Sequence, residues 1–259
     1  VNGLIADIAA KQHKMGSIPQ KIGDVYNLSM DTTRRNAEGI APVLPVLQEI
    51  DNVTDKAQWS EVLGKAMDYG LWAMYVDADA MNSSMNILNE YQAGFALSQK
   101  DYYVDKDEHT KHIRAEYLKH VEKMFELYGQ ANAAEKAATV LRLETRLAKA
   151  AFSNVELRDP IANYNKMSVE ELQKLVPEVD WKVYFAGLNI APDSLSVGQI
   201  RHLQEAGKML AEESLEDMKT LFTWQVIDGS SDFLTEEIFM QNFEFYGRIL
   251  SGRQEPTPL

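Results

Sequence analysis

Imidazole and carboxylate side chains that can bind a metal ion occur close together in one segment of the sequence. His109, His112 and His120 follow one another, and Glu116 precedes His120 by four positions. On a helix that spacing places Glu116 and His120 on one face, where they could hold a divalent ion. A metal site usually needs three convergent ligands, and His109 is about 16 Å from His120 along a helix axis. We therefore name Glu116 and His120 as candidate ligands but favour the alternative, a solvated helix edge.

Paired carboxylates are a second group that could do chemistry, as general acid and base. They are Asp77 with Asp79, Glu170 with Glu171, Glu212 with Glu213, and Glu236 with Glu237. Neighbouring residues on a helix point about 100° apart, so most of these pairs do not converge on one substrate. Solvated helix faces are the interpretation that we favour, with a structural role near a turn for Asp77 and Asp79.

The sequence contains none of the common short motifs of catalytic or nucleotide-binding sites. It has no Gly-x-Ser-x-Gly, no Gly-x-Gly-x-x-Gly, no Gly-x-x-x-x-Gly-Lys and no His-Glu-x-x-His. Cysteine is absent, which excludes disulfides, thiolate zinc ligands and cysteine nucleophiles. We therefore assign no catalytic residue to this chain.

Composition and charge narrow the class of protein further. The 259 residues include 39 acidic and 26 basic side chains, a formal net charge of −13, and 45% are hydrophobic. Such a chain can bury a sizeable core, but it lacks the basic surface that nucleic acids need. No apolar run approaches the roughly 18 residues of a membrane-spanning helix, and residues 1–10 do not resemble a signal peptide. We expect a globular protein with no nucleic-acid partner and no transmembrane segment.

The elements that position these side chains are mostly helices. Glycine and proline are scarce, at 14 and 8 residues, and apolar residues recur at helical spacing from Ile113 to Tyr128. Capping boxes are expected at Asn132 with Glu135 and at Ser168 with Glu171. We predict a mainly α, multi-helix fold with at most a small β-hairpin near residues 71–91 and a loop or short extended piece over 189–197. The expected helices cover about 18–36, 54–69, 107–129, 132–152, 168–176, 199–223 with a break near Ala211, and 232–250.

Several motifs resemble one enzyme family. Arg158-Asp159-Pro160 followed by Tyr164-Asn165-Lys166-Met167 is similar to a signature of the neprilysin and endothelin-converting-enzyme family of zinc metallopeptidases. The resemblance extends over most of the chain, in order, through Lys21 to Tyr26, Asp31, Arg35-Asn36, Gly39, Gln92 to Tyr103, Leu172-Gln173, Asp180-Trp181 and Gly252 to Pro256.

The resemblance implies that residues 1–259 are the amino-terminal, non-catalytic half of such an enzyme, truncated at both ends. This half would be a helical lid domain, and residues 251–259 would begin the linker to the catalytic domain. In the family, zinc held by two histidines and a glutamate activates water for attack on a peptide bond, and those residues lie beyond this chain. The cofactor of the full-length enzyme is then zinc, with none expected in this chain. Its partners would be the catalytic domain of the same polypeptide and oligopeptide substrates, in a periplasmic, envelope-anchored or secreted location.

Two interpretations of the chain and of its main motif remain open. The alternative to the lid domain is a freestanding helical protein-interaction module without catalytic activity. Within the motif, Arg158 and Tyr164 are candidates for contact with a peptide. The structural alternative is that Asp159 caps a short helix after Pro160, which Tyr164 and Met167 anchor to the core.

Overall fold

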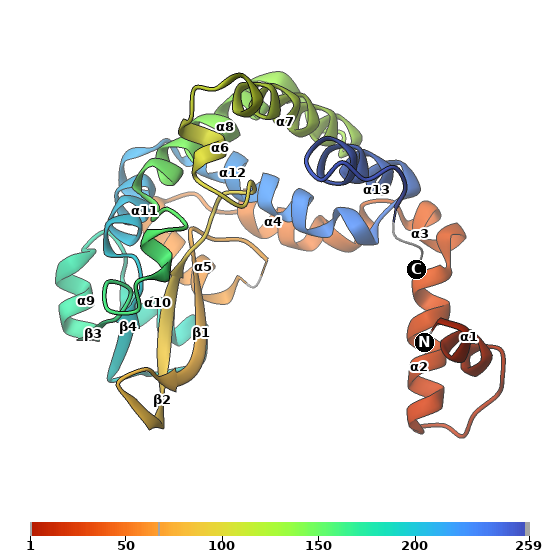
Figure 1. Ribbon diagram of the computed structural model, residues 1–259, viewed down its shortest axis with the longest axis horizontal. Coiled ribbons are helices and arrows are strands. Elements are labelled where there is room, and N and C mark those ends of the chain that lie inside the picture. Colours follow the sequence, from red (N-terminus) through yellow and green to blue (C-terminus); the bar gives the residue numbers. More distant parts are fainter. Residues whose placement is uncertain (1, 67, 257–259) are drawn as a thin grey trace. The chain divides into compact units, whose positions relative to one another are not determined.

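The protein consists of two compact units in a computed structural model that describes residues 2–66 and 68–256. One unit comprises Val1–Pro42 and Ser230–Leu259, and the other comprises Val43–Gly229. Both are built mainly from α-helices (Figure 1), so the predicted fold class is confirmed. Within the described residues, no helix has the length and apolar character needed to cross a membrane.

The first unit is formed by segments from both ends of the sequence. The single helix predicted over 18–36 is two helices, because the side chain of Asp31 accepts a hydrogen bond from the Arg34 amide (2.9 Å) and starts a new helix there. Asn36 accepts a hydrogen bond from the Glu236 amide (2.9 Å), which ties the two segments together. The elements are α1 (Asn2–Ala9), α2 (Ile18–Met30), α3 (Thr32–Glu38), η4 (Ser231–Phe233), α13 (Glu236–Asn242) and the π-helical η5 (Phe243–Ile249).

The second unit contains the longest helices and the sheet. Its helices are α4 (Leu44–Asp51), α5 (Trp59–Lys65), α6 (Asp101–Val104), α7 (Glu108–Leu127), α8 (Ala133–Ala150), α9 (Val169–Leu175), α10 (Trp181–Gly187), α11 (Ile200–Glu212) and α12 (Leu215–Ser230). Short 3₁₀ turns precede or join them at η1 (Ala41–Val43), η2 (Lys56–Gln58) and η3 (Glu156–Arg158).

The core of the second unit lies where α7 packs against α8. The apolar stripe predicted for α7 is confirmed, since Ile113, Tyr117 and Val121 are at most 1% exposed. Leu143 and Leu147 of α8 are fully buried. Burying each large apolar side chain contributes roughly 1.5–3 kcal/mol, so this contact adds substantially to the stability of the unit.

A four-stranded mixed sheet completes the second unit. Its strands are β1 (Trp72–Asp79), β2 (Asn82–Gln92), β3 (Asn165–Ser168) and β4 (Ser194–Val197), in the order β1-β2-β4-β3. β1 and β2 form the predicted hairpin, and β4 pairs parallel to β2 and antiparallel to β3 (Figure 1). The sheet is therefore larger than the expected hairpin. β3 and β4 have four residues each, too few to show a clear alternation of apolar and polar side chains.

Helix α10 covers one face of the sheet and contacts α5 very closely. The Trp72 ring of β1 lies 5.3 Å from Trp181 and 5.5 Å from Tyr184 of α10, measured between ring centroids. On the other side of α10, a Cβ atom added to Gly64 of α5 would lie 2.3 Å from the Tyr184 carbonyl oxygen. Only glycine at that position allows the two helices to approach so closely.

Some helix boundaries differ from the sequence prediction. The capping box at Ser168 and Glu171 is confirmed. Asn132 precedes α8 but has left-handed backbone geometry (φ 56°) and no side-chain cap, so the capping box predicted there is wrong. The helix predicted over 54–69 is shorter, because Ala66 adopts extended geometry as the chain turns toward β1. Of the linker predicted over 251–259, residues 251–256 contain no helix or strand, and residues 257–259 lie outside the described residues.

Candidate functional site

The candidate Tyr164 is bound to the end of the β-hairpin. Its hydroxyl donates a hydrogen bond to Oδ1 of Asp79 (2.7 Å), and Lys166 Nζ forms an ion pair with Oδ2 (2.9 Å). Asp79 is 2% exposed. The Tyr164 hydroxyl, followed by the Lys166 ammonium, lowers the pKa of Asp79 to about 2, so the carboxylate stays charged. In this arrangement Tyr164 joins two parts of the sheet that are far apart in sequence.

The helix expected after Pro160 does not form. Residues 160–164 make turns instead, and the Asp159 carboxylate accepts hydrogen bonds from the amides of Ile161 (2.9 Å) and Ala162 (3.1 Å). Asp159 thus caps a turn, as its residue type favours, but the chain then continues into β3. Arg158 lies exposed at the end of η3. Among the described residues, no hydrogen bond or ion pair joins Arg158 to Tyr164.

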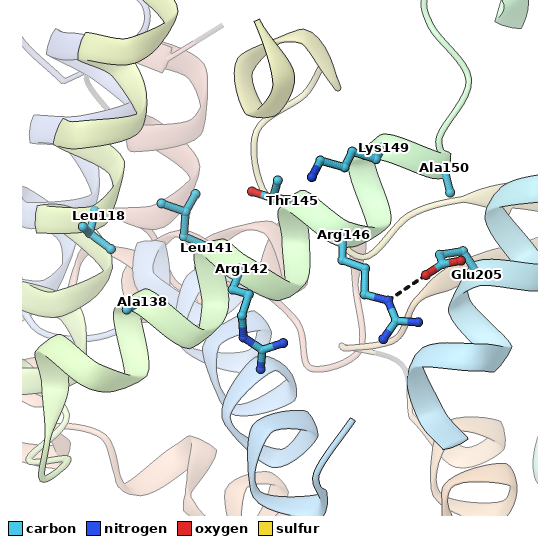
Figure 2. A pocket seen from close by; sticks show the side chains of 9 residues that line it. All are labelled: Leu118, Ala138, Leu141, Arg142, Thr145, Arg146, Lys149, Ala150 and Glu205. Carbon is cyan, nitrogen blue, oxygen red and sulfur yellow. Dashed lines mark hydrogen bonds and ion pairs between the residues drawn. The ribbon is translucent and has the colours of Figure 1, made fainter. Parts of the chain in front are cut away.

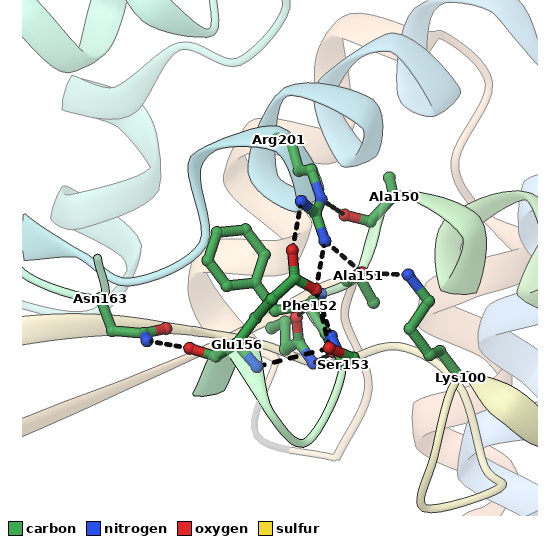
Figure 3. A network of polar contacts seen from close by, with 9 residues as sticks. Lys100, Ala150, Ala151, Phe152, Ser153, Glu156, Asn163 and Arg201 are labelled. Atoms are coloured by element: carbon green, nitrogen blue, oxygen red, sulfur yellow. Dashed lines mark hydrogen bonds and ion pairs between the residues drawn. The ribbon is translucent and has the colours of Figure 1, made fainter. Parts of the chain in front are cut away.

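A polar network beside this motif fixes the end of α8 (Figure 3). Arg201 of α11 donates to both carboxylate oxygens of Glu156 (2.7 and 2.8 Å) and to the carbonyl of Ala150 (2.9 Å). Its guanidinium also lies 4.3 Å from the ring centroid of Phe152. The bond from Arg201 is the main reason that the pKa of Glu156 falls to about 2. This fork geometry holds the chain that leads from α8 to the Arg158 motif.

The candidate metal ligands on α7 contact other side chains. Glu116 forms an ion pair with Lys119 (2.7 Å), while His120 is 2% exposed and packs edge-on against Trp224, with 5.7 Å between ring centroids. In the part of the chain that the structure describes, no three His, Cys, Asp or Glu side chains group as a metal site would require. Among the described residues, no third ligand joins Glu116 and His120.

A buried carboxyl group that sequence reasoning did not single out lies at the centre of the second unit. Glu144 of α8 is fully buried, and its Oε2 accepts hydrogen bonds from the hydroxyls of Tyr103 (2.9 Å) and Tyr117 (2.8 Å). The Ala96 amide donates to Oε1 (3.2 Å), and Trp224 Nε1 donates to the Tyr117 hydroxyl (2.9 Å). Burial raises the pKa of Glu144 to about 8 despite these donors. The sequence signal was present, since Glu144 interrupts an apolar stripe on its helix.

A cleft of about 490 Å³ lies beside this cluster. One of its walls is the start of β1, and another is the loop after β2. Gln225 of α12 holds the two walls together, since it accepts a hydrogen bond from the Gly70 amide (2.8 Å) and donates one to the Gly94 carbonyl (3.2 Å). Gly94 has a φ of 93°, which L-residues rarely adopt. The cleft is lined by Leu63, Ala66, Asp68, Tyr69, Gly70, Leu71, Trp72, Ala73, Met74, Ala93, Gly94, Phe95, Ala96, Tyr184, Leu188, Trp224, Gln225, Asp228 and Gly229.

A second hollow, of about 750 Å³, lies along α8 and contains two arginines (Figure 2). Arg146 forms ion pairs of 2.6 Å each with Glu205, Glu212 and Glu213. Arg142 pairs with Glu213 as well (2.7 Å). These carboxylates neutralise the arginines, so the network joins α8 to the end of α11 and does not offer a site for an anion.

The sequence of this chain matches a known protein family over its whole length. The sequence model described as Peptidase family M13 matches residues 1–259. The chain belongs to peptidase family M13. Its resemblance to neprilysin and endothelin-converting enzymes is thereby confirmed, and relatives in this family are zinc metallopeptidases.

The relatives are longer proteins that contain this M13 region. Neprilysin-11 of Caenorhabditis elegans is 25% identical over 236 residues, which are 83% of this chain and 28% of the relative. Endothelin-converting enzyme 1 of Bos taurus is 27% identical over 247 residues, 89% of this chain and 32% of the relative. The chain therefore spans about a third of the length of the curated relatives that it matches.

A solved structure of a bacterial relative has the same fold. The zinc metalloprotease Zmp1 of Mycobacterium tuberculosis, in complex with an inhibitor, matches with a TM-score of 0.92 and 29% sequence identity. The match covers 99% of this chain and 40% of that one. The M13 region of this chain and the corresponding part of Zmp1 are thus built alike almost throughout.

Proposed function

We propose that this chain is the non-catalytic, chamber-forming domain of a zinc-dependent endopeptidase that hydrolyses short peptides. The observation that carries the proposal is the match to Zmp1, which includes nearly all of this chain but only 40% of that metalloprotease. The sequence contains no His-Glu-x-x-His, so zinc and the residues that activate water would belong to the remaining part of the parent polypeptide. The freestanding module is not favoured, because the relatives carry this region within much longer chains.

An exposed apolar face on α2 supports a partner of the kind that this proposal requires. A contiguous apolar surface on a soluble protein usually marks an interface. On α2, exposed apolar residues follow the helical repeat at Ile18 (74%), Ile22 (36%), Val25 (66%) and Leu28 (58%). We assign this face to the catalytic domain of the same polypeptide, which would cover it.

The proposed domain acts by enclosure. A lid over a zinc site excludes bulk water and limits access to short, flexible peptides. The exposed Arg158 is the motif residue that remains available to touch such a peptide, whereas the hydroxyl of Tyr164 is engaged by Asp79. The same proposal places the enzyme outside the cytoplasm, as a periplasmic, envelope-anchored or secreted protein.

The first experiment measures peptide hydrolysis by the purified chain with added zinc. We expect none, and chelator-sensitive hydrolysis by residues 1–259 alone would contradict the division of roles. The second mixes this chain with the separately expressed remainder of the parent polypeptide and measures binding between them. Val25→Asp on the apolar face should weaken binding at least tenfold, while Asn27→Asp on the opposite face of α2 should not. Equal affinities for the two variants would show that α2 is not the contact surface.

A further inference from the structure

The strand β1 is an edge of the sheet, and in the described part of the chain no hydrogen bond engages the backbone groups of Trp72, Met74 and Val76 on that side. The Gln92 amide donates to Gln199 (2.7 Å), and the Glu90 carbonyl accepts from the Gly198 amide (3.1 Å), so the backbone groups of Glu90 and Gln92 point away from β1. Their antiparallel partners on β1 are Met74 and Trp72. In an antiparallel pair, two opposed residues point their backbone N–H and C=O groups either toward each other or both away from each other. The backbone groups of Trp72 and Met74 therefore face the outer edge. Those of Val76 face the same way, because the direction alternates along a strand.

This edge lacks the usual protection against pairing. β1 has eight residues with no proline and no lysine, and its register is regular until the irregularity between Ala78 and Asp79. The Asp77 carboxylate accepts a hydrogen bond from the Ala78 amide (2.7 Å), which closes the edge at that end. Trp72 to Val76 therefore offer an open ladder for a partner strand of about five residues.

The cleft beside β1 has the chemistry of a pocket for a basic side chain. Trp72 and Met74 line it, so it is continuous with the open edge. The lining includes the carboxylates of Asp68 and Asp228 and the rings of Tyr69 and other aromatic residues, but no Lys, Arg or His. An alkyl stem ending in a cation is favoured by aromatic walls and by nearby carboxylates. The volume of about 490 Å³ is within the range of small-ligand pockets.

Two side chains at the cleft are consistent with binding of a polar group. Among the described residues, no hydrogen bond or ion pair engages the carboxylate of Asp68, and the buried hydroxyl of Tyr69 has no partner. Burial raises the pKa of Tyr69 to about 12, so the phenol stays neutral beside the cleft.

We propose that the open edge of β1 and this cleft form a binding site for an extended peptide, which adds to β1 as a strand and places a lysine or arginine side chain in the cleft. The site would select peptides that have an extended backbone and a basic side chain. This proposal rests on the proposed function, which supplies peptides as the molecules that the domain meets. β-strand addition joins affinity from the backbone with selectivity from a side-chain pocket.

Charge favours a peptide over a second copy of the chain. Pairing of two β1 edges would place Asp77 of both copies on one short ribbon, where like charges repel. A basic peptide is instead attracted to the chain, because the chain carries a net charge of −13. Pairing with a second copy is one of the outcomes that the experiment below distinguishes.

The test uses the intact chain, residues 1–259, and a fluorescein-labelled acetylated hexapeptide with one lysine among alternating valines and alanines. Fluorescence anisotropy should show binding that weakens at least tenfold when the lysine is replaced by glutamate. Asp68→Asn should weaken binding of the lysine peptide about fivefold or more. Asp193→Asn, which removes the same charge at another exposed position of the second unit, should leave it unchanged. No binding, or equal binding of the lysine and glutamate peptides, would overturn the proposal.

A second measurement locates the peptide without any variant. Amide hydrogen exchange, resolved by residue, should show slower exchange at Met74 and Val76 when the lysine peptide is added and no change on α7. Protection that appears without peptide and increases with protein concentration would assign the edge to a second copy and overturn the proposal. The proposed function fails by a different result, hydrolysis of peptides by this chain, so the two failures are distinguishable.

Discussion

Single residues of the second unit combine burial with charge, and Glu144 is the clearest case. A fully buried carboxyl group pays a large desolvation cost when it is ionised, and three hydrogen-bond donors offset only part of it. Burial of Glu144 therefore lowers the free energy of unfolding, while its hydrogen bonds fix the geometry of Tyr103, Tyr117 and Trp224. These three aromatic side chains meet between α6, α7 and α12. Ala96 lines the cleft, and its amide donates a hydrogen bond to Glu144, so the same carboxyl group also holds this wall of the cleft in place.

The raised pKa of Glu144 predicts a pH dependence of folding stability. Its pKa is about 8 in the folded chain, against about 4.3 for an unfolded glutamate. The folded state binds the extra proton in that window, so Glu144 alone should lower the free energy of unfolding as pH rises from about 4.3 to 8, by at most ~1.4 kcal/mol per pH unit. Glu90 has the same direction and value of shift, so both groups contribute.

The measurement is urea denaturation at pH 5, 7 and 9. Glu144→Gln should reduce the fall of the free energy of unfolding with rising pH, because one of the two buried carboxyl groups is removed. Glu135→Gln, at an exposed position on the same helix, should leave the slope as it is. Parallel curves for the parent chain and Glu144→Gln would show that Glu144 does not titrate in this window.

What the sequence predicts at this scale depends on sequence distance. The capping box of Ser168 with Glu171 involves residues three positions apart, and the sequence predicts it correctly. The partner of Tyr164 is Asp79, 85 positions away, and no local pattern identifies that pair. The cleft likewise gathers residues from several separate segments, so its lining could be found only once the chain was folded.

At the scale of elements, local periodicity predicts most helices and the β-hairpin but not the rest of the sheet. The α7 stripe and the two strands around Asn82 are visible because each pattern lies within one continuous segment. The strands β3 and β4 exist because β4 pairs with β2, for instance Leu195 with Leu88. Their stability comes from tertiary pairing, so propensity alone indicates only a loop or short extended piece.

The close approach of α5 and α10 yields a test at the same scale. Gly64→Ala would place a Cβ atom 2.3 Å from the Tyr184 carbonyl oxygen, so the helices must separate. We expect a loss of about 1–3 kcal/mol in the free energy of unfolding, as for other overpacked sites.

Gly229→Ala serves as the matched control, since a Cβ atom there meets nothing within 4 Å. Gly229 lies in α12, and alanine favours a helix, so this variant should be unchanged or more stable by up to about 1 kcal/mol. Thermal and urea unfolding of both variants provide the comparison. Equal stability of Gly64→Ala and the parent would contradict the packing described for α5 and α10.

At the scale of the whole molecule, the division into two units predicts how the chain can be cut. Val43–Gly229 is one continuous segment with its own core, and we expect this fragment to fold alone and to unfold cooperatively in urea. Residues 1–42 alone should stay unfolded, because α3 would lack its partner α13. Far-UV circular dichroism of both fragments checks this, and gradual, non-cooperative unfolding of residues 43–229 would contradict it.

The unit formed from both ends of the sequence has a consequence for how the protein is made. Residues 1–42 leave the ribosome before Val43–Gly229, but the segment 230–256 that completes their unit emerges only after all of Val43–Gly229 has been translated. Synthesis from the amino terminus thus favours folding of the central segment first, while α1 to α3 still lack the segment 230–256 that completes their unit. The time needed to translate residues 43–256 sets how long this interval lasts, and through all of it the residues of α3 that contact α13 stay uncovered.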